Sequence, residues 1–179
     1  MARSRDGPRV PALEPDVEEV RRALAEDWGD AGDVTTRAAT AGGRDARVEA
    51  HVIARRPAVV AGLAEASLAF ALAGAKVEHR VEEGARAEAD AVVAVVRGPA
   101  TAVLAAERVA LNYLMRMSGI AQATRALQDE ASRANPRCRV AATRKTTPLF
   151  RRAEKRAVVL SEPALPNVTV PGPLTVLHW

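Results

Sequence analysis

The long run of helical periodicity between residues 99 and 134 constrains the fold of this chain more than any other feature. Apolar residues recur there at the spacing of one helix face: Val103, Leu104, Val109, Ala110, Leu111, Leu114 and Met117. Such spacing predicts a helix that packs against a core along most of its length. Pro99 suits the first helical position, and Ser118 suits a helix cap. We therefore expect two consecutive helices, with a break at Ser118-Gly119 and the second ending near Ala134.

The chain before this run alternates between short helical and strand patterns. The expected elements are helices at residues 16–27 and 63–73 and strands at residues 46–54, 76–81 and 91–97. Asp16 is placed to cap the first helix, and Gly74 to close the second. Between the first helix and the first strand lies Glu26–Thr36, a turn-rich segment of carboxylates and hydroxyls. This order of elements suggests an α+β domain.

The segment after the long helical run has a different pattern. Cys138–Ala142 predicts a short apolar strand, the residues of Thr143–Pro148 form a loop, and Phe150–Val158 predicts a helix. A strand, a loop and a helix in this order are how a βα unit of a parallel sheet or barrel begins.

Composition limits the core and the surroundings of the protein. Hydrophobic residues make up 48% of the chain and aromatic residues 3%, so the core is expected to consist of alanine and valine with closely packed helices. Cys138 is the single cysteine, which excludes an internal disulfide and fits a reducing compartment. We expect Cys138 to be a small buried residue of a strand.

The chain contains no run of about 18 apolar residues, so no membrane span is predicted. The first residues do not resemble a secretory signal. We expect a cytoplasmic protein.

The loop Thr143-Arg-Lys-Thr-Thr-Pro148 carries the strongest chemical signal. Ligands of parallel α/β folds bind where strands end. Arg144 offers a planar fork of donors for a carboxylate or phosphate, Lys145 a point charge, and Thr143 a hydroxyl group. A compact anion with several oxygens is the expected ligand, and the net charge of +4 agrees with an anionic partner. The alternative is a basic surface loop without a ligand.

A second polar signal lies in Glu107-Arg-Val-Ala-Leu-Asn112. Arg108 and Asn112 are four residues apart and share one face of an otherwise apolar helix. The alternative interpretation is a solvated stripe with a Glu-Arg pair.

Other polar residues are better explained without a ligand. Asp27, Asp30 and Asp33 could suggest a metal loop, but their spacing does not continue into a calcium-binding pattern, so we interpret them as turn residues. His51 and His79 have no metal-ligand spacing and are expected to be structural or surface residues. The sequence therefore predicts no residue that coordinates a metal.

Several segments occur in a characteristic order: Glu26–Thr36, Glu107–Asn112, Ser118–Ala121, Thr143–Pro148, Arg151 and Glu154–Val158. Together they closely resemble the quinolinate phosphoribosyltransferase family over about residues 16–158. The resemblance implies an α+β amino-terminal open sandwich domain followed by the beginning of an α/β barrel. The domain bounds expected are a disordered start at 1–15, a sandwich domain with its connecting helix at 16–112, the start of the barrel at 113–158 and an unassigned tail at 159–179.

The resemblance also implies a reaction. Quinolinate and phosphoribosyl pyrophosphate, with Mg²⁺ present, would give nicotinic acid mononucleotide, pyrophosphate and CO₂ in NAD biosynthesis. Arg144, Lys145 and Thr143 match the substrate-binding loop, with the catalytic role assigned to Lys145. Arg108 matches the arginine that a neighbouring subunit contributes, so a homodimer with shared active sites is implied.

The chain departs from the family pattern in two places. Leu149 stands where the family motif Thr-Pro-Gly-Leu-Arg has glycine, so a tight turn there is expected to be distorted. After Val158 the family's glycine-rich turn and His-Arg pair are missing, and four prolines follow in a short span. We interpret this change as a truncated or shifted reading frame, which sequencing of the gene would test.

Alternative functions follow from these observations. The chain could be an inactive family member, including a remnant that dimerises through its long helices, or a relative associated with molybdenum transport. The third alternative is a nucleic-acid-binding module, because basic residues crowd residues 137–156. That segment has Phe150 as its one aromatic residue for base stacking and contains no helix-turn-helix pattern.

Overall fold

The computed structural model describes residues 14–40, 46–136 and 138–161. Its helices are α1 (Val17–Trp28), α2 (Val34–Ala39), α3 (Leu63–Ala73), α4 (Ala100–Ala134) and α5 (Arg151–Leu160). Its strands are β1 (Arg47–Ala54), β2 (Ala58–Val59), β3 (Lys76–His79), β4 (Arg86–Ala87) and β5 (Ala91–Pro99). The expected start at 1–15 and tail at 159–179 lie outside the described residues, apart from 14–15 and 159–161.

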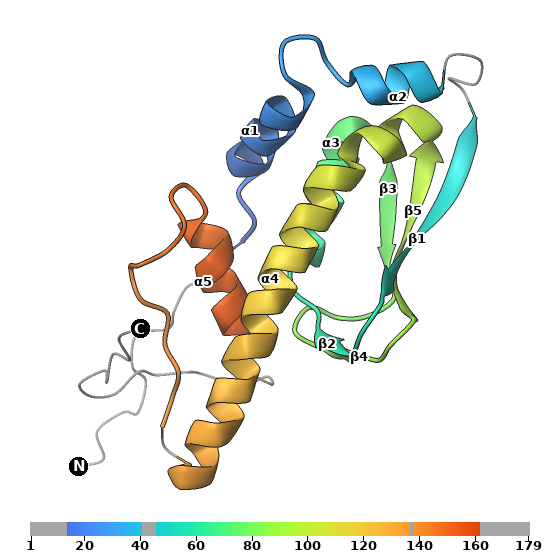
Figure 1. Cartoon of the computed structure of the whole chain (residues 1–179). Helices are drawn as coiled ribbons and strands as arrows, with labels where there is room; N and C mark the ends of the chain where they lie inside the picture. The colour runs from blue at the N-terminus through green and yellow to red at the C-terminus, as the bar shows by residue number, and fades with distance from the viewer. Residues whose placement is uncertain (1–13, 41–45, 137, 162–179) are drawn as a thin grey trace, which may run out of the picture.

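A three-stranded antiparallel sheet forms the first part of the molecule, with β5 between β1 and β3. Short strands β2 and β4 pair separately. The three main strands were all predicted, because their β-branched residues favour extended backbone. Figure 1 shows α4 starting beside the sheet and running away from it, so that its second half lies next to α5. The fold is therefore an open α+β sandwich followed by the beginning of a barrel, as expected.

The core consists mainly of alanine and valine, as the composition predicted. Small side chains allow the helices to approach closely, most clearly where α3 begins against α4. Gly62 has φ +97°, and a Cβ atom added there would lie 3.0 Å from the carbonyl oxygen of Tyr113 and 3.1 Å from Sδ of Met117. Glycine is therefore required at this position both by its backbone conformation and by the helix contact.

The predicted break at Ser118-Gly119 is wrong, because α4 continues through both residues to Ala134. The hydroxyl group of Ser118 accepts a hydrogen bond from the amide of Ala61 at 3.0 Å and donates one to the carbonyl of Ala61 at 3.1 Å. It thus ties α4 to the segment before α3 instead of capping a helix. The start of α4 was also predicted one residue early, since Pro99 ends β5 and is the N-cap.

The predicted strand at Cys138–Ala142 is not formed. A strand needs a neighbouring strand for its backbone groups, and none lies beside this segment within the part of the chain that is described. The side-chain amide of Gln128 replaces that partner: its Oε1 accepts from the amide of Val140 at 2.8 Å, and its Nε2 donates to the carbonyl of Cys138 at 3.0 Å. Cys138 is exposed, so its assignment as a buried strand residue is also wrong.

The segment after α1 holds a short helix, α2, that the sequence pattern did not predict. Asp33 caps it by accepting a hydrogen bond from the amide of Thr36 at 3.0 Å, which agrees with the interpretation of these carboxylates as local turn residues. At the start of α1, Asp16 accepts from the amides of Glu18 and Glu19, as predicted.

Over the described residues, no helix combines the length and apolar character that crossing a membrane requires.

Candidate active site

The loop of residues 143–148 lies between the extended segment at 138–142 and α5, beside the second half of α4. A hollow of about 460 Å³ opens between these three parts of the chain. Thr143 and Lys145 line it, and the hydroxyl group of Thr143 accepts from the amide of Lys145 at 3.0 Å. Arg144 is exposed and is not among the lining residues, while its carbonyl accepts from Arg151 at 3.4 Å. The structure therefore brings two of the three predicted loop residues to one cavity.

The wall of this hollow is partly apolar. Its apolar lining residues are Ile120, Ala123, Leu127, Val140, Ala141, Ala142 and Val158. Lys145, Lys155 and Arg116 supply positive charge around that wall. A planar anion with an apolar ring face and charged oxygens would match both kinds of lining.

A polar network that the sequence interpretation missed borders the same hollow. Arg116 on α4 donates to Oε1 of Glu154 at 2.5 Å and to the hydroxyl group of Thr147 at 2.9 Å. Glu154 on α5 also accepts from the hydroxyl group of Thr147 at 2.7 Å and from its amide at 3.2 Å. The available sequence signal was Arg116 itself, a charge within an apolar helical run.

The charge state of Glu154 follows from this network. Burial alone would raise its pKa, but hydrogen bonds from Arg116 and Thr147 outweigh burial, so the pKa of Glu154 lies below its usual value. The carboxylate is thus held in its charged form, and it directs its oxygens at Arg116 and Thr147.

Arg108 lies elsewhere on the molecule. It borders a second hollow, of about 350 Å³, formed by the first half of α4 and the segment around α2. Its guanidinium group donates to Oδ1 of Asp27 at 2.8 Å, and this contact raises the pKa of Arg108. The two hollows have no lining residue in common among the described residues. One chain therefore does not bring Arg108 to Lys145.

Three apolar side chains of α4 lie beside Arg108 in this hollow, together with polar residues of α4 and of the segment around α2. Leu104 is 42% exposed and Met115 is 65% exposed, and both line the second hollow together with Leu111. These residues recur at intervals of seven and four, so they share one face of α4.

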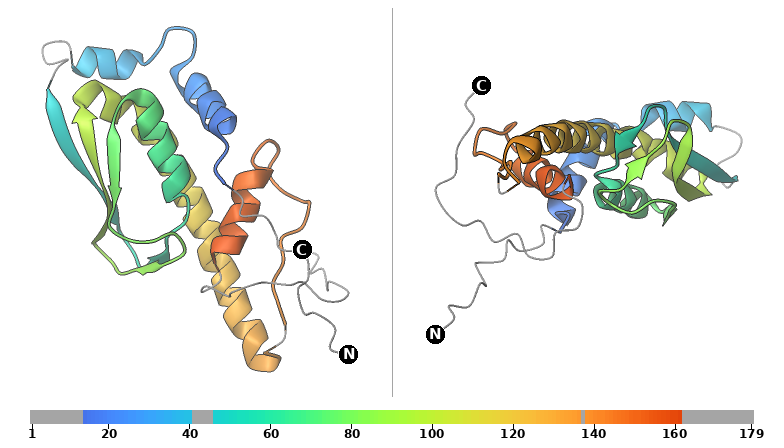
Figure 2. Two further views of the ribbon diagram at one scale, coloured as in Figure 1. Left: turned by 180° about the vertical axis from the view of Figure 1, so that it is seen from behind. Right: turned by 90° about the horizontal axis from the view of Figure 1, so that it is seen from below.

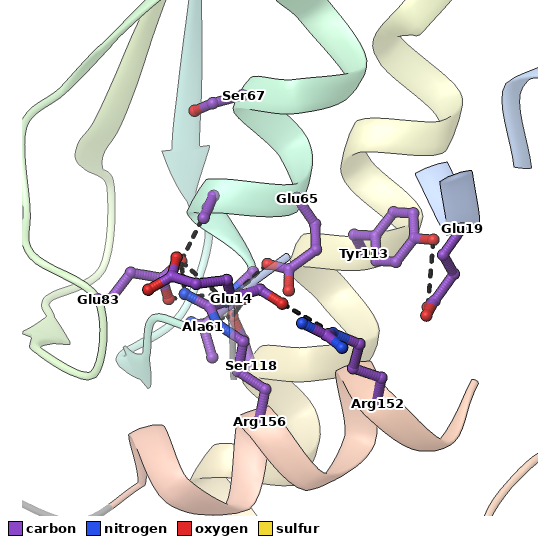
Figure 3. Close-up of polar contacts among 12 residues, drawn as sticks. Glu14, Glu19, Ala61, Glu65, Ser67, Glu83, Tyr113, Ser118, Arg152 and Arg156 are labelled. Atoms are coloured by element: carbon purple, nitrogen blue, oxygen red, sulfur yellow. Dashed lines mark hydrogen bonds and ion pairs between the residues drawn. The ribbon is translucent and has the colours of Figure 1, made fainter. Parts of the chain in front are cut away.

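A buried ionic cluster joins α5 to the sandwich domain (Figure 3). Arg156 donates to Oε2 of Glu65 at 2.7 Å and to Oε1 of Glu83 at 3.3 Å. Glu83 in turn accepts from the amides of Gly62 and Ala64, at 3.1 and 2.8 Å, at the start of α3. Burial raises the pKa of Glu65, and the nearby charge of Arg156 only partly offsets that effect. The cluster fixes α5, and with it Glu154, relative to the sandwich domain.

His51 and His79, which were expected to be structural or surface residues, each contact a neighbouring polar side chain. His51 contacts Glu49 at 3.0 Å and His79 contacts Ser67 at 2.7 Å, both at the surface. Within residues 14–40, 46–136 and 138–161, no three histidine, cysteine, aspartate or glutamate side chains gather as a metal site would require.

Comparison with known proteins identifies the two parts of the chain separately. Residues 33–118 match the family model described as quinolinate phosphoribosyl transferase, N-terminal domain. Residues 120–161 match the model described as quinolinate phosphoribosyl transferase, C-terminal domain. The two matches lie on either side of residue 119 in α4, and together they include every lining residue of both hollows except Asp27.

Individual relatives agree with the family models. A probable nicotinate-nucleotide pyrophosphorylase (carboxylating) of Archaeoglobus fulgidus is 45% identical over 111 residues, which are 62% of this chain and 43% of the relative. Quinolinate phosphoribosyltransferase (decarboxylating) 1b of Nicotiana tabacum is 38% identical over 143 residues, which are 79% of this chain and 39% of the relative. The chain thus spans about two fifths of the length of these curated relatives.

Solved structures show the same likeness. NadC from Streptococcus pyogenes has a TM-score of 0.73 and 32% identity, covering 80% of this chain and 50% of that one. The nicotinate-nucleotide pyrophosphorylase from Ehrlichia chaffeensis has a TM-score of 0.74 and 30% identity, covering 82% of this chain and 53% of that one.

Proposed function

Because this chain belongs to the quinolinate phosphoribosyltransferase family, we propose that its larger hollow binds quinolinate for phosphoribosyl transfer. The second substrate would be phosphoribosyl pyrophosphate, and the products nicotinic acid mononucleotide, pyrophosphate and CO₂. This reaction would place the protein in NAD biosynthesis. The single observation that carries the proposal is the position of Thr143 and Lys145 on a hollow with an apolar wall.

Quinolinate is a pyridine ring with two carboxylates, and its chemistry matches this lining. The ring can lie against Ile120, Leu127 and Val140, while the ammonium group of Lys145 neutralises a carboxylate. Holding the ring nitrogen near the sugar carbon converts an encounter of two anions into a reaction between positioned groups. We assign Lys145 the catalytic role, and we propose Thr143 and Arg144 as further substrate-binding residues.

A homodimer would complete this site. The family resemblance assigns Arg108 to a neighbouring subunit's active site, and here Arg108 is separated from Lys145 within one chain. The open apolar face of Leu104, Leu111 and Met115 surrounds Arg108, and burial against a second copy would stabilise such a face. We propose that this face is where two copies meet.

Mg²⁺ is expected from the family resemblance, but the described residues do not supply a site for it. Glu154 is the carboxylate that lines the larger hollow, and its oxygens are engaged by Arg116 and Thr147. A hard cation requires several oxygen ligands. No step proposed for this chain therefore passes through the metal.

Three alternatives to this proposal differ in how well the observations support them. Because the chain spans about two fifths of its curated relatives, binding without turnover is the second candidate function. Binding of nucleic acid is less well supported, since Arg151, Arg152 and Arg156 donate hydrogen bonds to acceptors within the chain. The likeness to a nicotinate-nucleotide pyrophosphorylase and a quinolinate phosphoribosyltransferase favours quinolinate over a molybdenum-related role. We propose a cytoplasmic location, with which the free thiol of Cys138 agrees.

Calorimetric titration with quinolinate tests the binding proposal. Lys145→Met should weaken binding at least about tenfold, because a charge-assisted hydrogen bond of roughly 1.5–3 kcal/mol is lost. Arg139→Met is the matched control, since it also removes one positive charge near the loop but Arg139 does not line the hollow. Equal affinities for wild type and Lys145→Met would exclude this hollow as the quinolinate site.

Turnover is tested separately, by following nicotinic acid mononucleotide after both substrates and Mg²⁺ are added. If wild type forms the product and Lys145→Met does not, the result supports catalysis by this chain. Binding of quinolinate without any product supports the second candidate function.

A further inference from the structure

The loop that carries Thr143 and Lys145 has few backbone hydrogen bonds of its own. Two local bonds are formed, from the amide of Thr146 to Arg144 and from the amide of Phe150 to Thr147. A loop without a sheet or helix ladder needs side-chain contacts to hold one conformation. The contacts that reach this loop from other elements therefore decide where Lys145 lies.

Arg116, Glu154 and Thr147 form a closed ring of such contacts. A single nitrogen of Arg116, Nη2, donates both to Glu154 and to Thr147, and the hydroxyl group of Thr147 donates to the same oxygen of Glu154. The second oxygen of Glu154 accepts from the backbone amide of Thr147. Every member is held by two others, so the backbone at Thr147 is specified from α4 and from α5 together.

The two helices that supply this ring are themselves fixed. Arg156 anchors α5 to Glu65 and Glu83 of the sandwich domain. Figure 3 shows these three side chains pointing toward one another. Arg125 of α4 donates to the carbonyl of Ser161, just beyond the end of α5. Because both helices are anchored elsewhere, the ring acts on the loop and not on the helices.

We propose that Arg116 and Glu154 are positioning residues, which hold Thr147 and thereby place Thr143 and Lys145 toward the hollow. This role rests on the proposed binding of quinolinate, although the mechanical part can be measured without any ligand. Arg116 and Glu154 act through Thr147, and Lys145 is the group that meets the substrate.

The test combines hydrogen exchange of the full chain with titration by quinolinate. In Glu154→Gln, Arg116→Met and Thr147→Val, amide exchange over residues 143–147 should accelerate about tenfold, while exchange in α3 stays unchanged. Quinolinate affinity should fall by a similar factor. Thr147→Ser keeps the hydroxyl group and should behave as wild type in both measurements. Arg152→Met, on α5 but outside the ring, is the charge-matched control and should change neither.

The outcomes separate this role from others. Unchanged loop exchange in Glu154→Gln and Arg116→Met overturns the proposal. A loss of affinity without faster loop exchange also overturns it, because Arg116 would then contact the ligand itself. If wild type binds no quinolinate, the proposed function fails, while faster loop exchange in the variants would still support the positioning of the loop. If amide exchange also accelerates in α3, in both Glu154→Gln and Thr147→Val, the positioning role is overturned. These residues would then act on the global stability of the protein.

Discussion

Leu149→Gly should stabilise the protein, although it removes a large apolar side chain. Leu149 has φ +63°, the left-handed conformation that costs a non-glycine residue roughly 1–2 kcal/mol. The residue is 87% exposed, so little apolar burial is lost on substitution. Glycine is at the same time more disordered in the unfolded chain, at a cost of about 0.5–1 kcal/mol. The difference is a net gain of about 0.5–1 kcal/mol.

The measurement is the free energy of unfolding from urea titration, together with the midpoint of thermal unfolding. A gain of this size in a chain of 179 residues corresponds to a rise of roughly 1–4 °C in the midpoint of thermal unfolding.

The structure also explains why the backbone strain at Leu149 is tolerated. The turn at Leu149 delivers Phe150 to the ring of Tyr113, with centroids 5.2 Å apart, and it starts α5.

Leu149→Ala is the control that decides the cause. Alanine removes the exposed leucine but keeps the penalty of a positive φ, so its stability should stay close to that of wild type. Leu149→Asn should fall between alanine and glycine, because asparagine tolerates this conformation better. Equal gains for Leu149→Ala and Leu149→Gly would refute backbone strain and assign the gain to loss of the exposed side chain. Destabilisation by Leu149→Gly would refute the reasoning altogether.

Three further predictions concern the sandwich domain. Gly62→Ala should lower the free energy of unfolding by about 1–3 kcal/mol in urea titration, because its Cβ would press on the backbone of Tyr113 and its φ is +97°. Asp16→Ala should cost about 1 kcal/mol in the same assay, with Asp16→Asn close to wild type, because the N-cap of α1 is lost only in the first. Burial raises the pKa of Glu65, so the folded protein holds this proton more tightly than the unfolded chain does. The contribution of this proton to the free energy of unfolding is present below the pKa that Glu65 has in the unfolded chain. It is lost as pH rises through the higher pKa that Glu65 has in the folded protein. Glu65→Gln should therefore remove this part of the fall in stability above about pH 4.5. Identical pH profiles for wild type and Glu65→Gln would contradict that assignment.

Much of the fold could be predicted because its signals are local. Helix α3 begins and ends where its periodicity and Gly74 indicated, and Asp16 caps α1 through its own neighbours. Strand β5 follows from a run of β-branched residues. In each case the residues that determine the element lie within a few positions of one another.

The candidate site was predicted only in part. Thr143 and Lys145 line one hollow, as a strand-end loop with adjacent cations suggested. Arg116 was missed because its partner Glu154 is 38 residues away, and spacing along the chain carries no information about such a pair. Arg108 was singled out as a polar residue on an otherwise apolar helix, and its partner in this chain is Asp27, 81 residues away.

The sequence alone determined helices α1, α3 and α5 and the three main strands, and it determined which loop gathers cations and hydroxyl groups. Only the tertiary structure decided that α4 runs unbroken through Ser118, because that hydroxyl group binds the backbone of Ala61, 57 residues away. Only the tertiary structure decided that residues 138–142 lie along Gln128 without forming a strand. Local propensity acts between neighbours in the chain, whereas a buried polar group takes whichever partner packing brings within hydrogen-bond distance.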